Sequence, residues 1–439
     1  MEYTPKYIRK ILKKTISEIS SNPQVFSKNP EKDFSRTRKL PFKKVVNSIL
    51  SMSCKDLKCE LMDFFEFDKN LPTVSAFVQQ RAKISSVAFE MLFRNFTSSI
   101  MKQKFYKGYR LLAVDGSDLH TPTNKKETNS FYSGTNGQKP YNLIHLNALY
   151  DIMNNLYVDA IVQPSHNANE HKAFVSMVDR DISTHPTIYI ADRGYESYNN
   201  LAHIQEKGQY FLFRIKDLNS SGMASGFNLP KTDEFDISID LCLTRKQTCH
   251  SKHSQNLKYI SHSATFDYLP PNTKKAIPII PYKLSFRLVR IKISEDKYEL
   301  LITNLKPEDF SSSNLKELYS MRWGIETSFR TLKYTLGLVY FHSKKEEYIT
   351  QEIFAKLTMY NFTELIPSHV VIHQRNRKHP CKVNFSASVH ICRSFFSDNI
   401  SPSLVEAFIS KYVVPIRQCV SNPRKMNSKT AVCFLYRVA

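Results

Sequence analysis

The sequence lacks any apolar run near the roughly 18 residues that a membrane-spanning helix needs. Its eight cysteines are scattered among 439 residues, without a CxxC pair or the tight spacing of a disulfide framework. No signal peptide is recognisable at Met1. These absences argue against membrane and secreted classes, and they predict a chain that works reduced in the cytoplasm.

Zinc motifs are also poorly represented. Cys242, Cys249, His250 and His253 lie close together and are residue types that bind zinc. However, the six residues between the two cysteines do not match the short spacings of common zinc motifs. A zinc site formed by these four residues is therefore a weak prediction.

Acidic residues are scarce relative to basic ones, with 40 Asp and Glu against 62 Lys and Arg, for a net charge of +22. An excess of this size predicts a polyanionic partner, most simply nucleic acid. The alternatives are a generally basic proteome and a membrane surface. No isolated basic amphipathic helix supports binding to a membrane surface.

The length of the chain predicts two to four domains.

The first 105 residues are predicted to be helical and basic. Pro41 suits the first turn of a helix, and two further helices are expected across 73–96 with a break near Ser85. Arg81 and Lys83 are candidates for contacts with phosphate groups. The segment is thus a candidate DNA-binding domain, with a plain helical support domain as the alternative.

Two buried strands are expected to end in an aspartate. Residues 109–114 lead into Asp115 and Gly116, and residues 187–191 lead into Asp192, Arg193 and Gly194. Open sheets place metal and ligand groups just beyond the carboxyl ends of strands, and a glycine there permits a turn with positive φ. The alternative is that each aspartate is only a turn or cap residue.

Further strands and helices fill the middle of the chain. Hairpins are predicted from 143–150 with 156–163 and from 284–294 with 297–305. Helices are expected at 166–178 and 197–207, and a strand at 209–216 carries Arg214 and Lys216. This order predicts an α/β fold with a mixed sheet flanked by helices.

Residues 315–338 read as one amphipathic helix with apolar side chains three and four residues apart. On its wheel a lone carboxylate, Glu326, lies among cations and a phenol. Such a strip suits a metal ion and a phosphodiester. The alternative is a solvated face with intrahelical pairs. The strip contains Tyr319, Arg322, Trp323, Arg330 and Lys333.

The spacing of Tyr319, Arg322, Glu326 and Lys333 resembles the Tyr-Arg-Glu-Lys signature of bacterial DDE insertion-sequence transposases, the insertion sequence 4 family. The two aspartate segments look like the first and second catalytic motifs of these enzymes. The resemblance spans about residues 110–361. It implies a ribonuclease H-like core at 106–216 and 306–365, a β-rich insertion at 217–305, and a helical, basic C-terminal region at 366–439.

The resemblance also implies a mechanism. Asp115, Asp192 and Glu326 would be catalytic and would hold two Mg²⁺ ions, with Mn²⁺ as a substitute. The enzyme would cut the transposon end and join the freed 3′ hydroxyl to target DNA. Phosphate groups would be held by Tyr319, Arg322 and Lys333, with weaker candidates in Arg193, Arg214 and Lys216. Arg330 is a further candidate for a DNA contact, and Trp323 could stack on a base or simply pack.

The implied partners are double-stranded DNA, as terminal inverted repeats and target, and a second copy of the chain in the synaptic complex. The implied location is the bacterial cytoplasm, at the nucleoid. Two alternatives stay open. One is a metal-dependent nuclease of the same fold without strand transfer, and the other is a catalytically silent DNA-binding protein.

Overall fold

The computed structural model of the chain describes residues 4–36, 38–100, 104–134, 137–218, 221–246, 257–269, 280–295, 297–370 and 379–416. Three members of the candidate zinc group, Cys249, His250 and His253, lie outside these ranges. The basic C-terminal residues 417–439 also lie outside them. Within the described ranges, no helix combines the length and hydrophobicity that crossing a bilayer requires.

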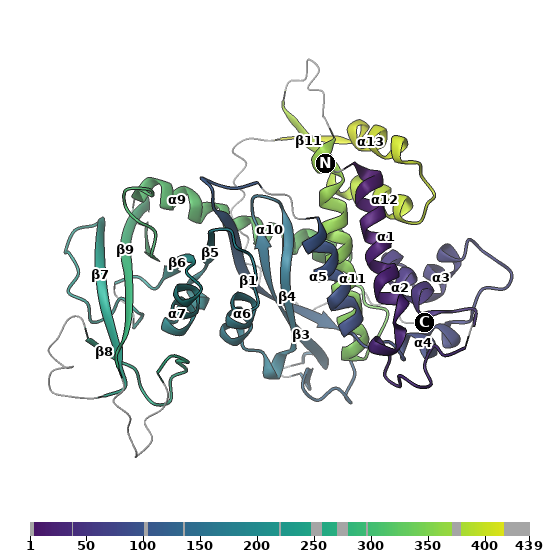
Figure 1. Ribbon diagram of the computed structural model, residues 1–439, viewed down its shortest axis with the longest axis horizontal. Coiled ribbons are helices and arrows are strands. Elements are labelled where there is room, and N and C mark those ends of the chain that lie inside the picture. The colour runs from purple at the N-terminus through teal and green to yellow at the C-terminus, as the bar shows by residue number, and fades with distance from the viewer. Residues whose placement is uncertain are drawn as a thin grey trace.

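A ten-stranded mixed sheet runs from the middle of the molecule to one end (Figure 1). Its strand order is β2-β3-β1-β5-β6-β10-β9-β7-β8, with β4 also paired to β3. β1, β3 and β4 are antiparallel neighbours, whereas β1, β5 and β6 run parallel. The strands are β1 Arg110–Thr121, β2 Phe131–Tyr132, β3 Tyr141–Asp151, β4 Leu156–Pro164, β5 Thr187–Ala191, β6 Tyr210–Ile215, β7 Phe235–Thr244, β8 Leu257–Tyr259, β9 Tyr282–Ser294 and β10 Lys297–Thr303.

Helices cover both faces of this sheet. α6 and α7 share an apolar core with one face, and α5, α10 and α11 pack on the other. Most of the remaining helices gather at one end of the molecule, around α11 (Figure 1). The helices are α1 Pro5–Ser21, α2 Phe42–Ser51, α3 Leu57–Phe64, α4 Val74–Arg81, α5 Val87–Ser99, α6 Glu170–Asp179, α7 Tyr198–Glu206, α9 Ser312–Met321, α10 Trp323–Tyr334, α11 Glu346–Leu365, α12 Phe385–Phe396 and α13 Pro402–Lys411.

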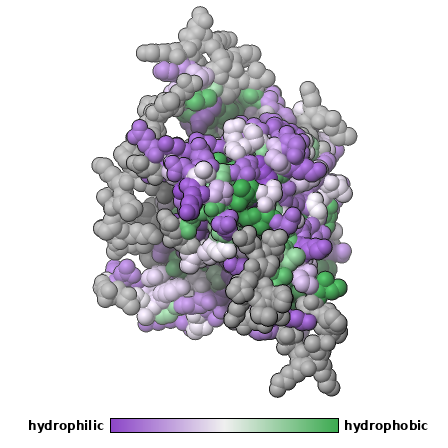
Figure 2. Space-filling view, turned by 90° about the vertical axis from the view of Figure 1, so that its left-hand side faces the viewer, coloured by the Kyte–Doolittle hydropathy of each residue, from purple (hydrophilic) through white to green (hydrophobic). Residues whose placement is uncertain are grey.

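The opposite end of the molecule is built from β7, β8 and β9 (Figure 1). Along β7, exposed polar residues alternate with half-buried Phe235, Ile237 and Ile239, which pack against the core on the α6 side. This period of two is typical of a strand with one covered face. Seen from this end, apolar side chains gather near the middle of the surface, with hydrophilic side chains around them (Figure 2).

Several expected elements are confirmed. The hairpin of β3 and β4 turns at Asn155, which has φ of 56°, and β9 pairs with β10 as predicted. β5 has the predicted bounds, and α4 and α5 are separated as expected near Ser85. Hydrophobic periodicity located these elements because each has one clear apolar face or an uninterrupted apolar run.

Two expectations about the predicted site segments were wrong. β1 does not end before Asp115, because it continues to Thr121 and pairs with β3 throughout. Gly116 therefore forms no turn, and its φ is not positive. Residues 315–338 also do not form one helix. The N–H of Arg322 donates to the carbonyl of Tyr319, three residues back, and this separates α9 from α10.

The break has a packing reason. Leu315 and Leu318 of α9 belong to an apolar cluster with β6 and β10, whereas Ile325 and Phe329 of α10 belong to the cluster around α11. Because the sheet twists, a single straight helix cannot lie flat on both regions. The one-residue interruption lets each half follow its own part of the sheet.

α11 is buried on nearly all sides and carries polar groups into the core. Glu352 pairs with Arg81 at 2.8 Å and accepts the backbone N–H of His342 at 3.0 Å. The ammonium group of Lys356 donates to the carbonyl of Met52 at 2.6 Å. The predicted phosphate contact of Arg81 was wrong, because this side chain is only 1% exposed and joins α4 to α11.

We expect Arg81→Ala to lower the free energy of unfolding by about 3 to 5 kcal/mol, because it leaves the buried carboxylate of Glu352 without its counter-ion. Urea denaturation followed by circular dichroism measures this loss. Lys58→Ala is the control, since Lys58 is exposed on α3, and it should change stability by less than about 0.5 kcal/mol. Equal effects in the two variants would contradict a central role for the Arg81 pair.

The same pair predicts a pH dependence. Burial alone would raise the pKa of Glu352, but the charges of Arg81 and His342 outweigh burial and lower it from 4.5 to about 2. Its contribution, about 3 kcal/mol, is therefore complete above pH 4.5 and is lost as the pH falls towards 2. The stability difference between the wild type and Glu352→Gln, measured by urea unfolding at several pH values, should shrink across this window. A constant difference would contradict the low pKa.

Candidate active site

The two predicted aspartates lie side by side at the centre of the sheet. The parallel pairing of β1 with β5 ends at Ala113 opposite Ile190, and two further residues along each chain bring Asp115 next to Asp192. Neighbouring strands lie about 4.8 Å apart, so this register places the two side chains on adjacent backbones. β5 ends at Ala191, which opens the sheet at this point, and the side chain of Asp192 caps the following turn by accepting the N–H of Gly194 at 2.8 Å.

Glu326 reaches the same region from α10, which packs on β1. Ile325 and Phe329 anchor this helix in the core that also contains Ala113. Asp115 is two residues beyond Ala113 and therefore points to the same face of the sheet. Three acids from separate parts of the sequence thus lie in one region, around the open end of β5.

Arg322 is the buried cation of this site. Its guanidinium donates to Glu326 at 2.7 Å, and its side chain is 5% exposed while that of Glu326 is 30% exposed. It also lies 5.7 Å from the ring centre of Tyr319 and 5.5 Å from that of Trp323. These contacts fix the guanidinium beside the glutamate and limit its freedom to reach outward.

The charges of the three acids affect one another. Burial is the main cause that raises the pKa of Asp115 to about 6, and the charges of Asp192 and Glu326 raise it further. The N–H of Gly116 and the charge of Arg322 act in the opposite direction. Asp115 is therefore a buried carboxyl group whose ionised form is disfavoured mainly by burial and is stabilised in part by Gly116 and Arg322.

The other residues of the predicted strip have different positions. Tyr319 is buried at the end of α9, whereas Trp323 is 52% exposed at the start of α10. The ammonium group of Lys333 donates to the carbonyl of Asp118 on β1 at 2.8 Å, and Arg330 is exposed. Lys333 therefore ties α10 to the strand that carries Asp115, while Arg330 and Trp323 face outward.

Arg193, Arg214 and Lys216 are brought together on the other side of Asp192. All three line one cavity of about 440 Å³. Arg193 and Lys216 also line a second cavity of similar size, which contains Lys258. Arg214 pairs with Glu299 at 3.0 Å. The structure thus places a basic, hollowed surface next to the second aspartate.

Sequence reasoning missed His145 and the role of Glu170. His145 on β3 lies 2.7 Å from Asp118 and 3.0 Å from Glu170 at the start of α6. Burial would lower the pKa of His145, but the two carboxylates outweigh burial and raise it to about 9. The only local signal was the strand predicted at 143–150, which contains His145. This strand, β3, pairs with the segment of Asp115 and Gly116.

The donor set of Asp115, Asp192 and Glu326 fits a divalent cation chemically, since all three offer hard carboxylate oxygens and repel one another when charged. Their oxygens do not yet converge on one point. In the ranges that the structure covers, no group of three or more His, Cys, Asp or Glu side chains is close enough to hold a metal ion. Binding a cation would require these side chains to draw together.

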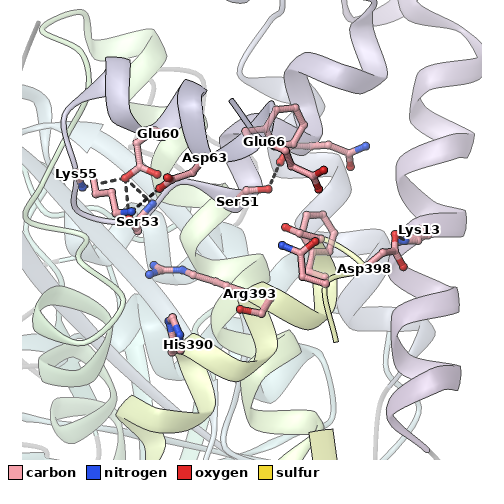
Figure 3. Close-up of a pocket in the computed structure, with 16 residues that line it drawn as sticks. Lys13, Ser51, Ser53, Lys55, Glu60, Asp63, Glu66, His390, Arg393 and Asp398 are labelled. Atoms are coloured by element: carbon pink, nitrogen blue, oxygen red, sulfur yellow. Dashed lines mark hydrogen bonds and ion pairs between the residues drawn. The ribbon is translucent and has the colours of Figure 1, made fainter. Parts of the chain in front are cut away.

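Another cavity of about 440 Å³ lies among the helices, between the α2–α3 segment and α12 (Figure 3). Its charged groups pair within its walls, Lys13 with Asp398 and Lys55 with Asp63. The predicted catalytic residues do not line it. The acids around the end of β5 are therefore the better candidate for an active site.

Comparison with known proteins identifies the family of the chain. A family model described as "Transposase DDE domain" matches residues 106–362. The transposase InsG of insertion sequence element IS4 from Escherichia coli (strain K12) is 22% identical over 339 residues, which cover 74% of this chain and 70% of that protein. The transposase of IS231E from Bacillus thuringiensis subsp. finitimus is 21% identical over 308 residues, 62% of this chain and 60% of its own length.

Among solved structures, the piggyBac transposase synaptic complex with hairpin DNA aligns with 98% of this chain and 88% of its own, at a TM-score of 0.44 and 11% identity. The family match is the stronger finding, since it spans more than half of the chain and contains Asp115, Asp192 and Glu326. The chain therefore belongs to the transposase DDE domain family and is a DNA transposase similar to those of IS4-type bacterial insertion sequences.

Proposed function

We propose that this transposase cuts both ends of its element and joins each freed 3′ hydroxyl to target DNA, with Asp115, Asp192 and Glu326 as the catalytic acids. The observation that carries the proposal is the register of β1 and β5, which puts Asp115 next to Asp192 and below α10. Phosphoryl transfer needs little covalent chemistry from the protein, so positioning and charge supply most of the catalysis.

We further propose a ribonuclease H-like core. The order β4-β3-β1-β5-β6, with three antiparallel strands followed by two parallel ones, supports this assignment. On this division the core comprises 106–216 and 306–365, and residues 217–305 are an insertion whose strands extend the same sheet through β10. The helical regions before and after the core would help to bind DNA.

Members of this family use divalent metal, and we propose two Mg²⁺ ions per site, replaceable by Mn²⁺. Asp115, Asp192 and Glu326 would hold these ions through their carboxylate oxygens. When bound, such ions activate the attacking oxygen and stabilise the leaving oxygen. Arg322 restrains the glutamate through its 2.7 Å contact, so that the carboxylate stays on the side of α10 that faces Asp115.

DNA phosphates would follow the cations on both sides of the acids. Lys333, Arg330 and Trp323 lie along α10, and Arg193, Arg214 and Lys216 line the neighbouring cavity. Tyr319 and Arg322 would contribute at the junction of α9 and α10, where Arg322 would act mainly by holding Glu326. Two ends must be held at once for joining, so we propose a dimer on the bacterial nucleoid in the cytoplasm.

A cleavage assay tests this proposal. Purified protein is incubated with Mg²⁺ and a labelled duplex that carries the inverted repeat flanking its gene. The wild type should cut at the repeat boundary and give joined products, and Glu326→Gln should lose both activities by a factor of at least about 1,000 without losing affinity for the duplex. Cutting without repeat specificity or joining would indicate a nuclease. Binding without cutting, also in Mn²⁺, would indicate a silent protein.

The burial of Arg322 gives a second prediction. We expect Arg322→Gln to lower the cleavage rate about 100-fold by releasing Glu326, because small misplacements of a catalytic group have effects of this size. Because Arg322 is buried, affinity for DNA and the salt dependence of binding should stay close to those of the wild type, whereas Arg330→Gln, which removes an exposed charge from the same helix, should lower both. A clearly lower affinity and a shallower salt dependence for Arg322→Gln would instead indicate direct contact with phosphate.

A further inference from the structure

A fourth carboxylate, Glu170, lies between the two aspartate motifs. It starts α6, which covers the sheet face opposite α10, and its side chain is 38% exposed. Its position can be located from the two glycines of those motifs. A Cβ atom added at either glycine would stand close to its carboxylate.

At Gly116, such a Cβ would lie 2.4 Å from Oε1 of Glu170 and 2.5 Å from Nε2 of His145. At Gly194, it would lie 3.0 Å from Oδ1 of Asp192 and 3.9 Å from Oε2 of Glu170. One oxygen of Glu170 thus rests against the backbone next to Asp115, and the other is a neighbour of Asp192. The glycine after the first aspartate is needed for this close approach and not for a turn.

A buried hydroxyl points to the same place. Tyr195 is 1% exposed, and its hydroxyl has no hydrogen-bond partner in the structure. Burial raises its pKa far above the usual value, and the charges of Glu170, Asp115 and Asp192 raise it further. Its ring packs against Phe174 and His171 of α6, the helix that begins at Glu170. A buried hydroxyl without a partner is costly. A ligand or water held between these acids would give it one.

His145 holds Glu170 in place. It contacts Glu170 at 3.0 Å and Asp118 at 2.7 Å, and its position on β3 is opposite Asp118 in the strand register. Lys333 contacts the carbonyl of the same Asp118 from α10. The carboxylate of Glu170 is therefore connected through short contacts to both the strand and the helix that carry the proposed catalytic acids.

We propose that Glu170 is a fourth acidic ligand of this transposase, which supplies a carboxylate oxygen to a divalent cation bound next to Asp192. This inference rests on the proposed function, because it assumes that Asp192 holds a metal ion. His145 then serves as a positioning residue, which keeps Glu170 beside Gly116 and Gly194. The oxygen ligands that Mg²⁺ and Mn²⁺ prefer are of this type.

Metal binding without DNA tests the proposal directly. The affinity of the full chain for Mn²⁺ is measured by electron paramagnetic resonance and by calorimetry, in the wild type and in Glu170→Gln. Asp179→Asn is the matched control, since Asp179 is also a carboxylate of α6 that pairs with a histidine, His203, at 2.8 Å. Asp192→Asn reports on the proposed function itself. Thermal unfolding checks that all four proteins are folded.

We expect Glu170→Gln to weaken Mn²⁺ binding at least about tenfold, a loss typical of altered metal shells, and Asp179→Asn to leave it unchanged. If Asp192→Asn loses Mn²⁺ while Glu170→Gln binds it like the wild type, the inference is overturned and the proposed function stands. If Asp192→Asn also binds normally, the metal assignment of the proposed function fails as well.

A change of ligand chemistry gives an independent test. Glu170→Cys replaces the carboxylate with a thiol on a shorter side chain, and sulfur ligands favour softer metals over Mg²⁺. Cleavage by this variant should be slow in Mg²⁺ and at least about tenfold faster in Mn²⁺. This ratio of the two rates should exceed the ratio measured for Asp179→Asn. An identical Mg²⁺-to-Mn²⁺ ratio in both variants, together with wild-type Mn²⁺ binding by Glu170→Gln, would show that residue 170 does not touch the metal.

Discussion

The buried charges of α11 are the constraint on which the rest of the molecule depends. A helix enclosed by protein on nearly all sides would ordinarily carry only apolar residues, yet α11 buries Glu352 and Lys356. Each finds its partner on an N-terminal element, Arg81 of α4 and the carbonyl of Met52 after α2. Because an unpaired buried charge is strongly destabilising, the N-terminal helices can take only the positions that satisfy these groups.

The catalytic region depends on that framework through α10. This helix lies between α11 and β1, and its apolar face belongs to the same core as the N-terminal helices. The electrostatic situation at the sheet is the reverse of that in α11. In α11 the buried charges have partners, whereas burial raises the pKa of Asp115 and the nearby Arg322 offsets this effect only in part. The buried charges of α11 thus stabilise the fold, whereas the buried carboxyl group of Asp115 has a shifted pKa. Shifted pKa values of this kind are common at functional sites.

Sequence patterns predicted the elements with one clear apolar face, such as β5 and the β9–β10 hairpin, because burial alone determines them. They also singled out Asp115, Asp192 and Glu326, which the sheet and α10 bring to one region. Three features depend on partners distant in sequence and were missed. The extension of β1 requires β3, the break at Arg322 requires two separate core regions, and the burial of Arg81 requires Glu352.

Glu170 and His145 illustrate the same limit at the site. Neither has a local motif, and their relation to Gly116 appears only when β3 and α6 lie against β1. A glycine beside an acid can indicate a turn or a close approach, and the local sequence does not distinguish the two. The strand register makes the distinction, because a residue in mid-strand has no turn to form.

The late position of α11 in the chain has a consequence for biosynthesis. Glu352, the partner of Arg81, is synthesised 271 residues after it, and Glu326 is synthesised after both Asp115 and Asp192. At about 5 to 20 residues per second, a ribosome needs on the order of ten to fifty seconds to bridge that interval. Until then the N-terminal helices cannot pack against α11, and Asp115 and Asp192 lack α10, which carries Glu326. Truncated products of translation would consequently lack a complete set of catalytic acids.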